Sequence, residues 1–191
     1  GEQPLPPPAG LVTSIAWQLG GQQTQYALEG SVFITGAAVQ WLRDGLGLIK
    51  NASDTEGIAE SVSDTGGMYF VPAFAGLGAP HWQPYATASI TGMTRGTSQH
   101  HIVRAALEAT AYQVKDVVGA MEGGRTNSSQ PLRADGGQSN NPFMMQFQAD
   151  ILDPVFVVDA EGQAGVGRFP PPMSSRPLQL IGMAAVVVEV V

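Results

Sequence analysis

The stretch that decides the fold is LRADGGQSNNP, residues 132–142. Its first three residues are predicted to end a short buried strand, and Gly136-Gly137 allows a turn with positive φ where a ligand can approach bare backbone. Asn141 is a good N-cap residue and is followed by a proline, so we expect a helix over Phe143–Leu152. The first N–H groups and the positive dipole end of that helix face the glycines and can hold an anion or a polar ring edge.

Two interpretations of this stretch stay open on the residues alone. The first interpretation is a purely structural role, because a strand, a Gly-Gly turn and a capped helix occur in many α/β proteins that bind nothing there. The other is a cradle for a nucleotide, which needs no basic side chain at the helix start.

Composition and charge exclude several classes of function. The chain has 191 residues, 43% hydrophobic and 13% charged, which places it among globular domains. The net charge of −7 argues against nucleic-acid binding, and no basic run is present for an anionic membrane. The absence of cysteine excludes disulfides, thiolate catalysis and Cys-based zinc sites, and fits a cytoplasmic protein.

No apolar stretch of the sequence is long enough to span a bilayer, and the start lacks the order of a signal peptide. The first four residues, GEQP, do not resemble a natural initiation. We therefore expect the chain to begin inside a longer protein.

Periodicity and turn residues predict an α/β domain upstream of the opening stretch. The expected elements are a hairpin of Leu11–Gln18 and Gln25–Leu28, a helix from Val32 to about Leu46 capped by Ser31, one short helix within Asn51–Gly67, strands at Met68–Phe74 and Ala88–Thr94, and a long helix from Thr97 or Ser98 to about Glu122. A strand at Pro154–Asp159 is expected after the opening stretch.

Gly36 and Gln40 are four residues apart on an expected helix and therefore share a face. A glycine there lets a flat ligand reach the helix backbone, and the glutamine amide both donates and accepts hydrogen bonds. The alternative is a glycine at a helix crossing beside a solvated glutamine.

The loop GLGAPHWQPY, residues 76–85, is rigid and aromatic. Trp82 and Tyr85 have two possible roles: stacking on a ligand, or pinning the loop to its own domain by burial. His81 has no second histidine at ligand spacing, so we predict no metal site.

The long helix carries one continuous apolar stripe with steps of four and three residues, which is typical of a packing helix. The stripe consists of Val103, Leu107, Thr110, Val114, Val117 and Met121. Glu108 follows Arg104 at a spacing of four, which favours an ordinary surface pair over a catalytic carboxylate. His100 and His101 have no nucleophile nearby and are expected at the surface.

Beyond residue 159 the sequence changes character. Residues 160–177 are rich in Gly, Pro and Ser without periodicity, and Leu178–Val191 is apolar, with a possible helix at Leu178–Ala185 and then a strand. The chain contains no P-loop, no Ser-His-Asp set and no convincing carboxylate pair.

Several segments together resemble the FGGY family of carbohydrate kinases, and within it the glycerol kinases. They are YALEG at 26–30, GAAVQWLRD at 36–44, VPAFAGLGAPHW at 71–82, the second FGGY signature over 88–108, and Asp135-Gly136-Gly137 with Asn141 as the adenosine motif. The GLGAP loop is particular to glycerol kinases and disfavours a sister enzyme such as xylulokinase. The resemblance extends from Leu11 to about Asp159.

The resemblance implies a ribonuclease H-like, actin-like ATPase domain, a mixed sheet with flanking helices, here incomplete at both ends. Gly36, Gln40, Gly137 and Asn141 match family positions that contact ATP or ADP. The implied reaction transfers the γ-phosphoryl of ATP to a primary hydroxyl of glycerol, with Mg²⁺ and an aspartate base. Such chemistry depends on positioning and charge neutralisation.

The family's phosphate loops, glycerol-binding side chains and catalytic aspartate lie N-terminal to the segment that begins here. We therefore name no catalytic residue and no metal ligand, and expect Mg²⁺ and glycerol to be held mainly by the missing part. The isolated chain is expected to be inactive, while the parent enzyme is expected to be cytoplasmic and a homo-oligomer. The alternative is a non-catalytic remnant that binds adenine nucleotide or a partner.

The predicted organisation is a family domain over residues 1–159 and a divergent tail over 160–191. Asp159–Val191 does not resemble the strand and the helix with which the family continues. A shifted reading frame or a misjoined gene is our hypothesis for this change.

Overall fold

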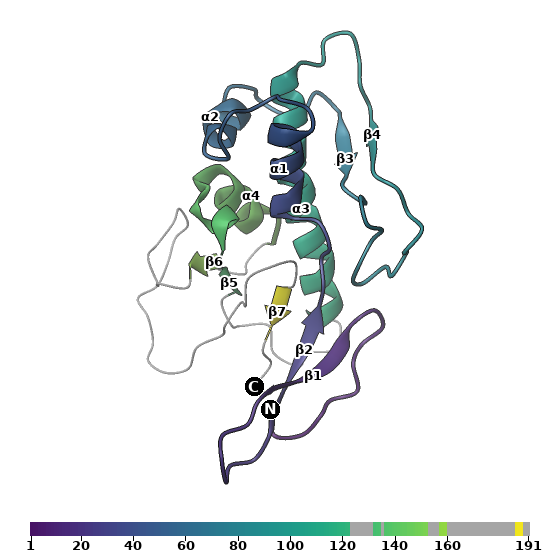
Figure 1. The fold of residues 1–191 in the computed structure, drawn as a ribbon, viewed down its shortest axis with the longest axis vertical. Coiled ribbons are helices and arrows are strands. Elements are labelled where there is room, and N and C mark those ends of the chain that lie inside the picture. Colours follow the sequence, from purple (N-terminus) through teal and green to yellow (C-terminus); the bar gives the residue numbers. More distant parts are fainter. Residues whose placement is uncertain (123–131, 135, 153–156, 160–185, 189–191) are drawn as a thin grey trace.

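The computed structural model describes residues 1–122, 132–134, 136–152, 157–159 and 186–188 (Figure 1). The described elements are β1 (Val12–Trp17), β2 (Gln25–Gly30), α1 (Gly36–Asp44), α2 (Asp54–Glu60), β3 (Tyr69–Val71), β4 (Ser89–Thr91), α3 (Gln99–Glu122), β5 (Leu132–Ala134), the 3₁₀ helix η1 (Gly137–Asn140), α4 (Pro142–Leu152), β6 (Val157–Asp159) and β7 (Val186–Val188). The α/β class predicted from the sequence is confirmed.

In place of one continuous mixed sheet, the described strands form three small sheets. The order β1-β2-β7 is antiparallel throughout, and β3 pairs antiparallel with β4. β5 and β6 are parallel, with Leu132 opposite Val157. The strand expected in the apolar tail is confirmed by β7. The expected loop at 160–177 and helix at Leu178–Ala185 lie outside the described residues.

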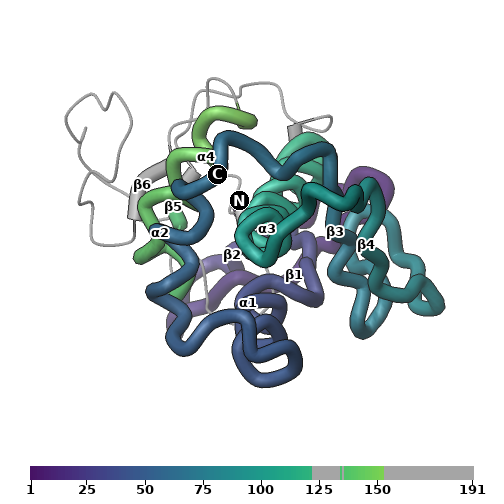
Figure 2. Tube along the Cα trace, turned by 90° about the horizontal axis from the view of Figure 1, so that it is seen from above, coloured from purple at the N-terminus to yellow at the C-terminus, as the bar shows by residue number. Residues whose placement is uncertain are grey.

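α3 is the central element of the domain. Seen end-on in Figure 2, it is surrounded by α1, α2, α4 and the β3–β4 hairpin. The predicted stripe is confirmed, because Val103, Leu107, Thr110, Val117 and Met121 are at most 1% exposed; the sixth member, Val114, is half-buried. A 24-residue helix with one apolar face can therefore organise two cores along its length.

Each half of α3 has its own core. The first half packs Val103 and Leu107 against Ala38 and Leu42 of α1 and Met68 beside β3. The second half packs Val117, Val118 and Met121 against Leu11, Val32, Met145 and Leu152. These two clusters hold the opening hairpin, α1 and α4 to a single helix.

The predicted start of α1 is wrong: the helix begins at Gly36 rather than Val32. Ser31 does not cap it, because the Ser31 carbonyl accepts a hydrogen bond of 2.8 Å from Ala79 N–H, and Thr35 is the N-cap residue. Val32 is buried in one core and Ile34 in the other. The helix therefore begins only after the two side chains that pack in different cores.

β3 and β4 are shorter than predicted. The apolar run at 68–74 is paired only over Tyr69–Val71, directly before Pro72, which has no N–H to donate to a ladder. Its partner β4 spans three residues where seven were expected. The single short helix expected within Asn51–Gly67 is confirmed by α2.

Two exposed carboxylates are bonded to backbone N–H groups around α2. Asp54 accepts from Asn51 N–H at 2.8 Å and Lys50 N–H at 3.2 Å, and Asp64 accepts from Gly66 N–H at 2.7 Å. These bonds favour the ionised form, so the backbone bond from Asn51 lowers the pKa of Asp54 and the bond from Gly66 lowers the pKa of Asp64.

We expect the free energy of unfolding to decrease as the pH is lowered from about 5 to 3. Because the folded-state pKa of both carboxyls lies below the unfolded value of about 3.9, their contribution is complete above that value and is lost as the pH falls through the folded pKa. Urea midpoints of Asp54→Asn should vary less with pH over this range. The control Glu2→Gln removes an exposed carboxylate that makes no hydrogen bond among the described residues. Identical pH profiles for Asp54→Asn and the unaltered chain would contradict this expectation.

Candidate functional site

The predicted strand–glycine–helix unit is present. Gly136 alone takes the positive φ, at 98°, while Gly137 is the first residue of η1, a 3₁₀ turn that the sequence did not predict. The Gly136 carbonyl accepts hydrogen bonds from Ser139 N–H at 3.0 Å and from the Ser139 hydroxyl at 2.7 Å. The two glycines therefore differ: Gly136 supplies the positive φ of the turn, and Gly137 is an exposed residue at the start of η1.

Asn141 caps α4 as predicted. Its Oδ1 accepts a hydrogen bond of 3.0 Å from Met144 N–H, the third helical residue, which satisfies one of the unpaired donors at the helix start. The opposite end of the same amide is also used, since Nδ2 donates to the Thr55 hydroxyl oxygen on α2 at 3.0 Å.

Gly36 and Gln40 lie on α1, at its first and fifth residues. A Cβ atom built on Gly36 would have no atom within 4 Å, and the same holds for Gly137. Gln40 is exposed. The hydrogen bonds of the described residues include none that joins this pair to Gly137 or Asn141, so the candidate residues form two separate sets, one on α1 and one on η1 and the start of α4. Both α1 and α4 lie beside α3 (Figure 2).

A further polar group lies beside Gly137. The Nε2 atom of Gln138 in η1 is enclosed and has no hydrogen-bond partner among the described residues. An enclosed amide without an acceptor costs free energy, so Gln138 Nε2 is an unsatisfied donor within the turn.

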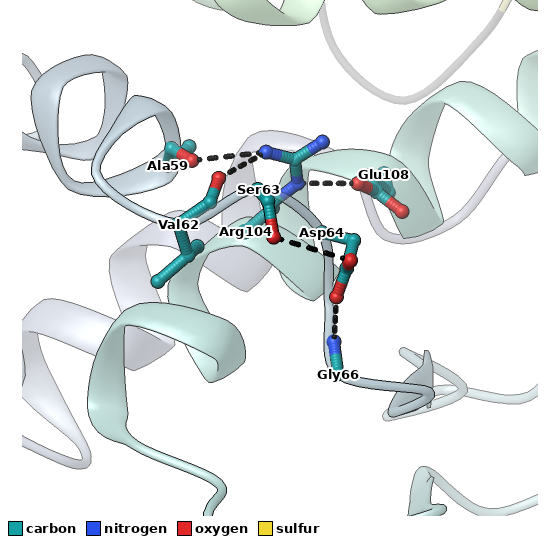
Figure 3. A network of polar contacts seen from close by, with 7 residues as sticks. All are labelled: Ala59, Val62, Ser63, Asp64, Gly66, Arg104 and Glu108. Carbon is teal, nitrogen blue, oxygen red and sulfur yellow. Dashed lines mark hydrogen bonds and ion pairs between the residues drawn. The ribbon is translucent and has the colours of Figure 1, made fainter.

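Arg104 and Glu108 form the predicted pair, but the predicted surface location is wrong. Their side chains are 15% and 9% exposed, and Arg104 Nε donates to Glu108 Oε1 at 2.8 Å (Figure 3). The spacing of four residues in the sequence predicts that Arg104 and Glu108 form a pair, but it does not predict which other elements bury that pair.

The rest of the Arg104 guanidinium is bonded to the end of α2. Nη1 donates to the carbonyls of Ala59 at 3.2 Å and Val62 at 2.6 Å (Figure 3). The guanidinium also lies over the Phe143 ring, 4.9 Å from its centroid. One side chain of α3 therefore holds the last turn of α2 and the first turn of α4.

Arg104, Thr55 and Phe143 were not identified from the sequence as residues that support the site. Thr55 and Asn141 are 86 residues apart, and no periodicity or spacing connects positions that far apart. The Arg104–Glu108 spacing was the only local signal of this network.

The two possible roles of the aromatic loop are resolved for Trp82 and stay open for Tyr85. Trp82 is pinned to its own domain, because its Nε1 donates to the Gly10 carbonyl at 2.7 Å and its ring meets Phe33 edge-on at 6.0 Å. Tyr85 is 96% exposed. His81 contacts the Asp116 carboxylate at 3.1 Å.

His100 and His101 are half-buried rather than at the surface. His100 Nδ1 lies 2.9 Å from the Ser61 hydroxyl, and His101 Nδ1 lies 2.8 Å from that of Ser98. Within the described ranges, no group of three or more His, Cys, Asp or Glu side chains is arranged to hold a metal ion. The helices described are also too short or too polar to cross a membrane.

The fold and the site place this chain in a class of proteins: α/β domains with a glycine turn at the start of a capped helix. Many proteins of this class bind nucleotides or phosphates at that turn. The model of the FGGY family of carbohydrate kinases, C-terminal domain, matches residues 1–167. The chain belongs to this family, and its fold is that of the family's actin-like ATPase domain.

Its relatives include glycerol kinases. It is 55% identical to glycerol kinase of Alkalilimnicola ehrlichii over 86% of this chain and 33% of that protein, and 58% identical to glycerol kinase 2 of Thermotoga maritima over 80% and 30%. The crystal structure of Plasmodium falciparum glycerol kinase with ADP is similar with a TM-score of 0.74 and 39% identity, over 83% of this chain and 31% of that one. The chain thus spans about a third of the length of these relatives.

We expect Arg104→Met to lower the free energy of unfolding by about 3 kcal/mol, because it leaves Glu108 as an unpaired enclosed charge and removes the donor to two carbonyls. Urea denaturation gives the value. Arg43→Met is the control, since it breaks an ion pair of 2.7 Å with Asp44 that is largely exposed and should change stability little. Equal effects of the two variants would contradict the role assigned to Arg104.

Proposed function

We propose that this chain is the nucleotide-side domain of a glycerol kinase, which transfers the γ-phosphoryl of ATP to a hydroxyl of glycerol to give glycerol 3-phosphate. The observation that carries the proposal is the 55–59% identity to glycerol kinases across about four fifths of the chain. The similarity to solved structures supports it too: the xylulose kinase of Lactobacillus acidophilus has 25% identity and a TM-score of 0.68 to this chain, against 39% and 0.74 for the glycerol kinase.

The residues present fit the adenosine end of ATP or ADP. Gly36 and Gly137 leave open space where a side chain would begin, and Gln40 is exposed. Asn141 keeps one amide proton and one lone pair beyond the two bonds that it already makes. Gly36, Gln40, Gly137 and Asn141 are therefore proposed as nucleotide contacts.

This chain contributes recognition of the nucleotide rather than the transfer step. Bound ATP supplies the phosphoryl group, and phosphoryl transfer depends on in-line positioning and charge neutralisation. From the family resemblance, Mg²⁺ and glycerol are assigned to parts of the full-length relatives that this chain does not span. We also propose, from the family resemblance, a cytoplasmic enzyme that self-associates at full length.

A boundary near residue 159 between the family domain and a divergent tail is part of the same proposal. The family match ends at residue 167, and the matches to the two glycerol kinases cover 164 and 152 residues.

Titration of the 191-residue chain with ADP in a calorimeter should release heat, and Gly137→Val should raise Kd at least about tenfold, because the new side chain occupies the space open to a ligand. Gly119→Val is the matched control: Gly119 is an exposed residue of α3 that also has open space at its Cβ position. The absence of heat from the unaltered chain, or equal Kd values for all three, would count against the site.

Purified chain mixed with ATP, Mg²⁺ and glycerol should form no glycerol 3-phosphate, because the residues proposed here recognise the nucleotide without performing the transfer. A coupled assay of ADP release measures this, with the full-length Thermotoga maritima enzyme as the positive control. Turnover by the 191-residue chain above the no-enzyme rate would overturn the assignment of the chemistry to the missing part.

A further inference from the structure

We propose that Thr55 is a positioning residue for adenine nucleotide, acting through Asn141. This inference rests on the proposed nucleotide site and adds to it a residue from α2, a helix in which the sequence indicated no functional position. The proposed residue touches Asn141 and is not assigned a contact with the nucleotide.

The direction of the hydrogen bonds carries the argument. The Thr55 hydroxyl donates its single proton to the Ala52 carbonyl at 2.6 Å. Its oxygen is therefore left with lone pairs only, and it accepts from Asn141 Nδ2 at 3.0 Å. Thr55 is 1% exposed, so water does not compete for this oxygen.

The other end of the Asn141 amide is equally determined. Oδ1 accepts from Met144 N–H at 3.0 Å. Turning the amide by 180° would place its NH₂ group against the Met144 N–H and its carbonyl against an oxygen without a proton to give. Both contacts would then be repulsive, so the chain Ala52–Thr55–Asn141–Met144 admits only one orientation of the amide.

The remaining proton and lone pair of Asn141 consequently point in directions set by α2 as well as by α4. Arg104 holds the end of α2 through the Ala59 and Val62 carbonyls and lies over Phe143 in the first turn of α4. The two helices cannot shift independently, which is the requirement for a preorganised binding group.

Thr55→Val removes the hydroxyl with little change of shape, and Thr55→Ser keeps it. We expect Thr55→Val to raise Kd for ADP about fivefold, the effect of losing one hydrogen bond that orients the binding group, and Thr55→Ser to remain near the unaltered value. Thr110→Val is the matched control: it removes a hydroxyl that is 1% exposed and bonds only to the Ala106 carbonyl of its own helix. Thr110→Val should leave Kd unchanged.

Amide hydrogen exchange gives a second measurement that does not require a nucleotide. Exchange of the Met144 N–H should accelerate in Thr55→Val and not in Thr55→Ser or Thr110→Val. Unchanged Kd and exchange in Thr55→Val, or an equal loss of affinity in Thr110→Val, would overturn the inference. Failure of the unaltered chain to bind ADP would overturn the proposed function, and the exchange rates alone would then decide whether Thr55 orients Asn141.

Discussion

The Arg104 guanidinium is the interaction on which the arrangement of three helices depends. It is covalently part of α3, is bonded to two carbonyls at the end of α2 (Figure 3), and lies over an aromatic ring of α4. An enclosed charge is costly unless it is paired and hydrogen-bonded; here Glu108 accepts from Arg104 Nε, and the two carbonyls accept from Nη1. The positions of α2 and α4 are therefore linked through one side chain.

The candidate nucleotide residues benefit from this linkage because they stand on helices or directly before one, rather than on free loops. Asn141 begins α4, whose following turns are anchored by Met145 and Leu152 in the second core. Gly36 begins α1, whose Ala38 and Leu42 are buried in the first core. Each set of residues is thus fixed to α3 by apolar packing, and the free polar groups at each terminus remain available to a ligand.

The role proposed for this domain is recognition of the nucleotide rather than the transfer step. The chain belongs to a family of carbohydrate kinases but spans only about a third of its glycerol kinase relatives. Its described residues offer bare backbone, amide groups and helix starts, which suit the uncharged part of a nucleotide. Transfer of a phosphoryl group requires, in addition, neutralisation of several negative charges.

The sequence by itself determined the elements whose signals are local. Asn141 and the proline behind it define the start of α4, one apolar stripe defines α3, and motif residues identify the family, because each of these is encoded within one turn or one short segment. Only the tertiary structure decided the late start of α1, the burial of Arg104 and Glu108, and the bond between Thr55 and Asn141. Those features depend on contacts between segments tens of residues apart, and neither periodicity nor capping chemistry specifies which distant side chains will meet.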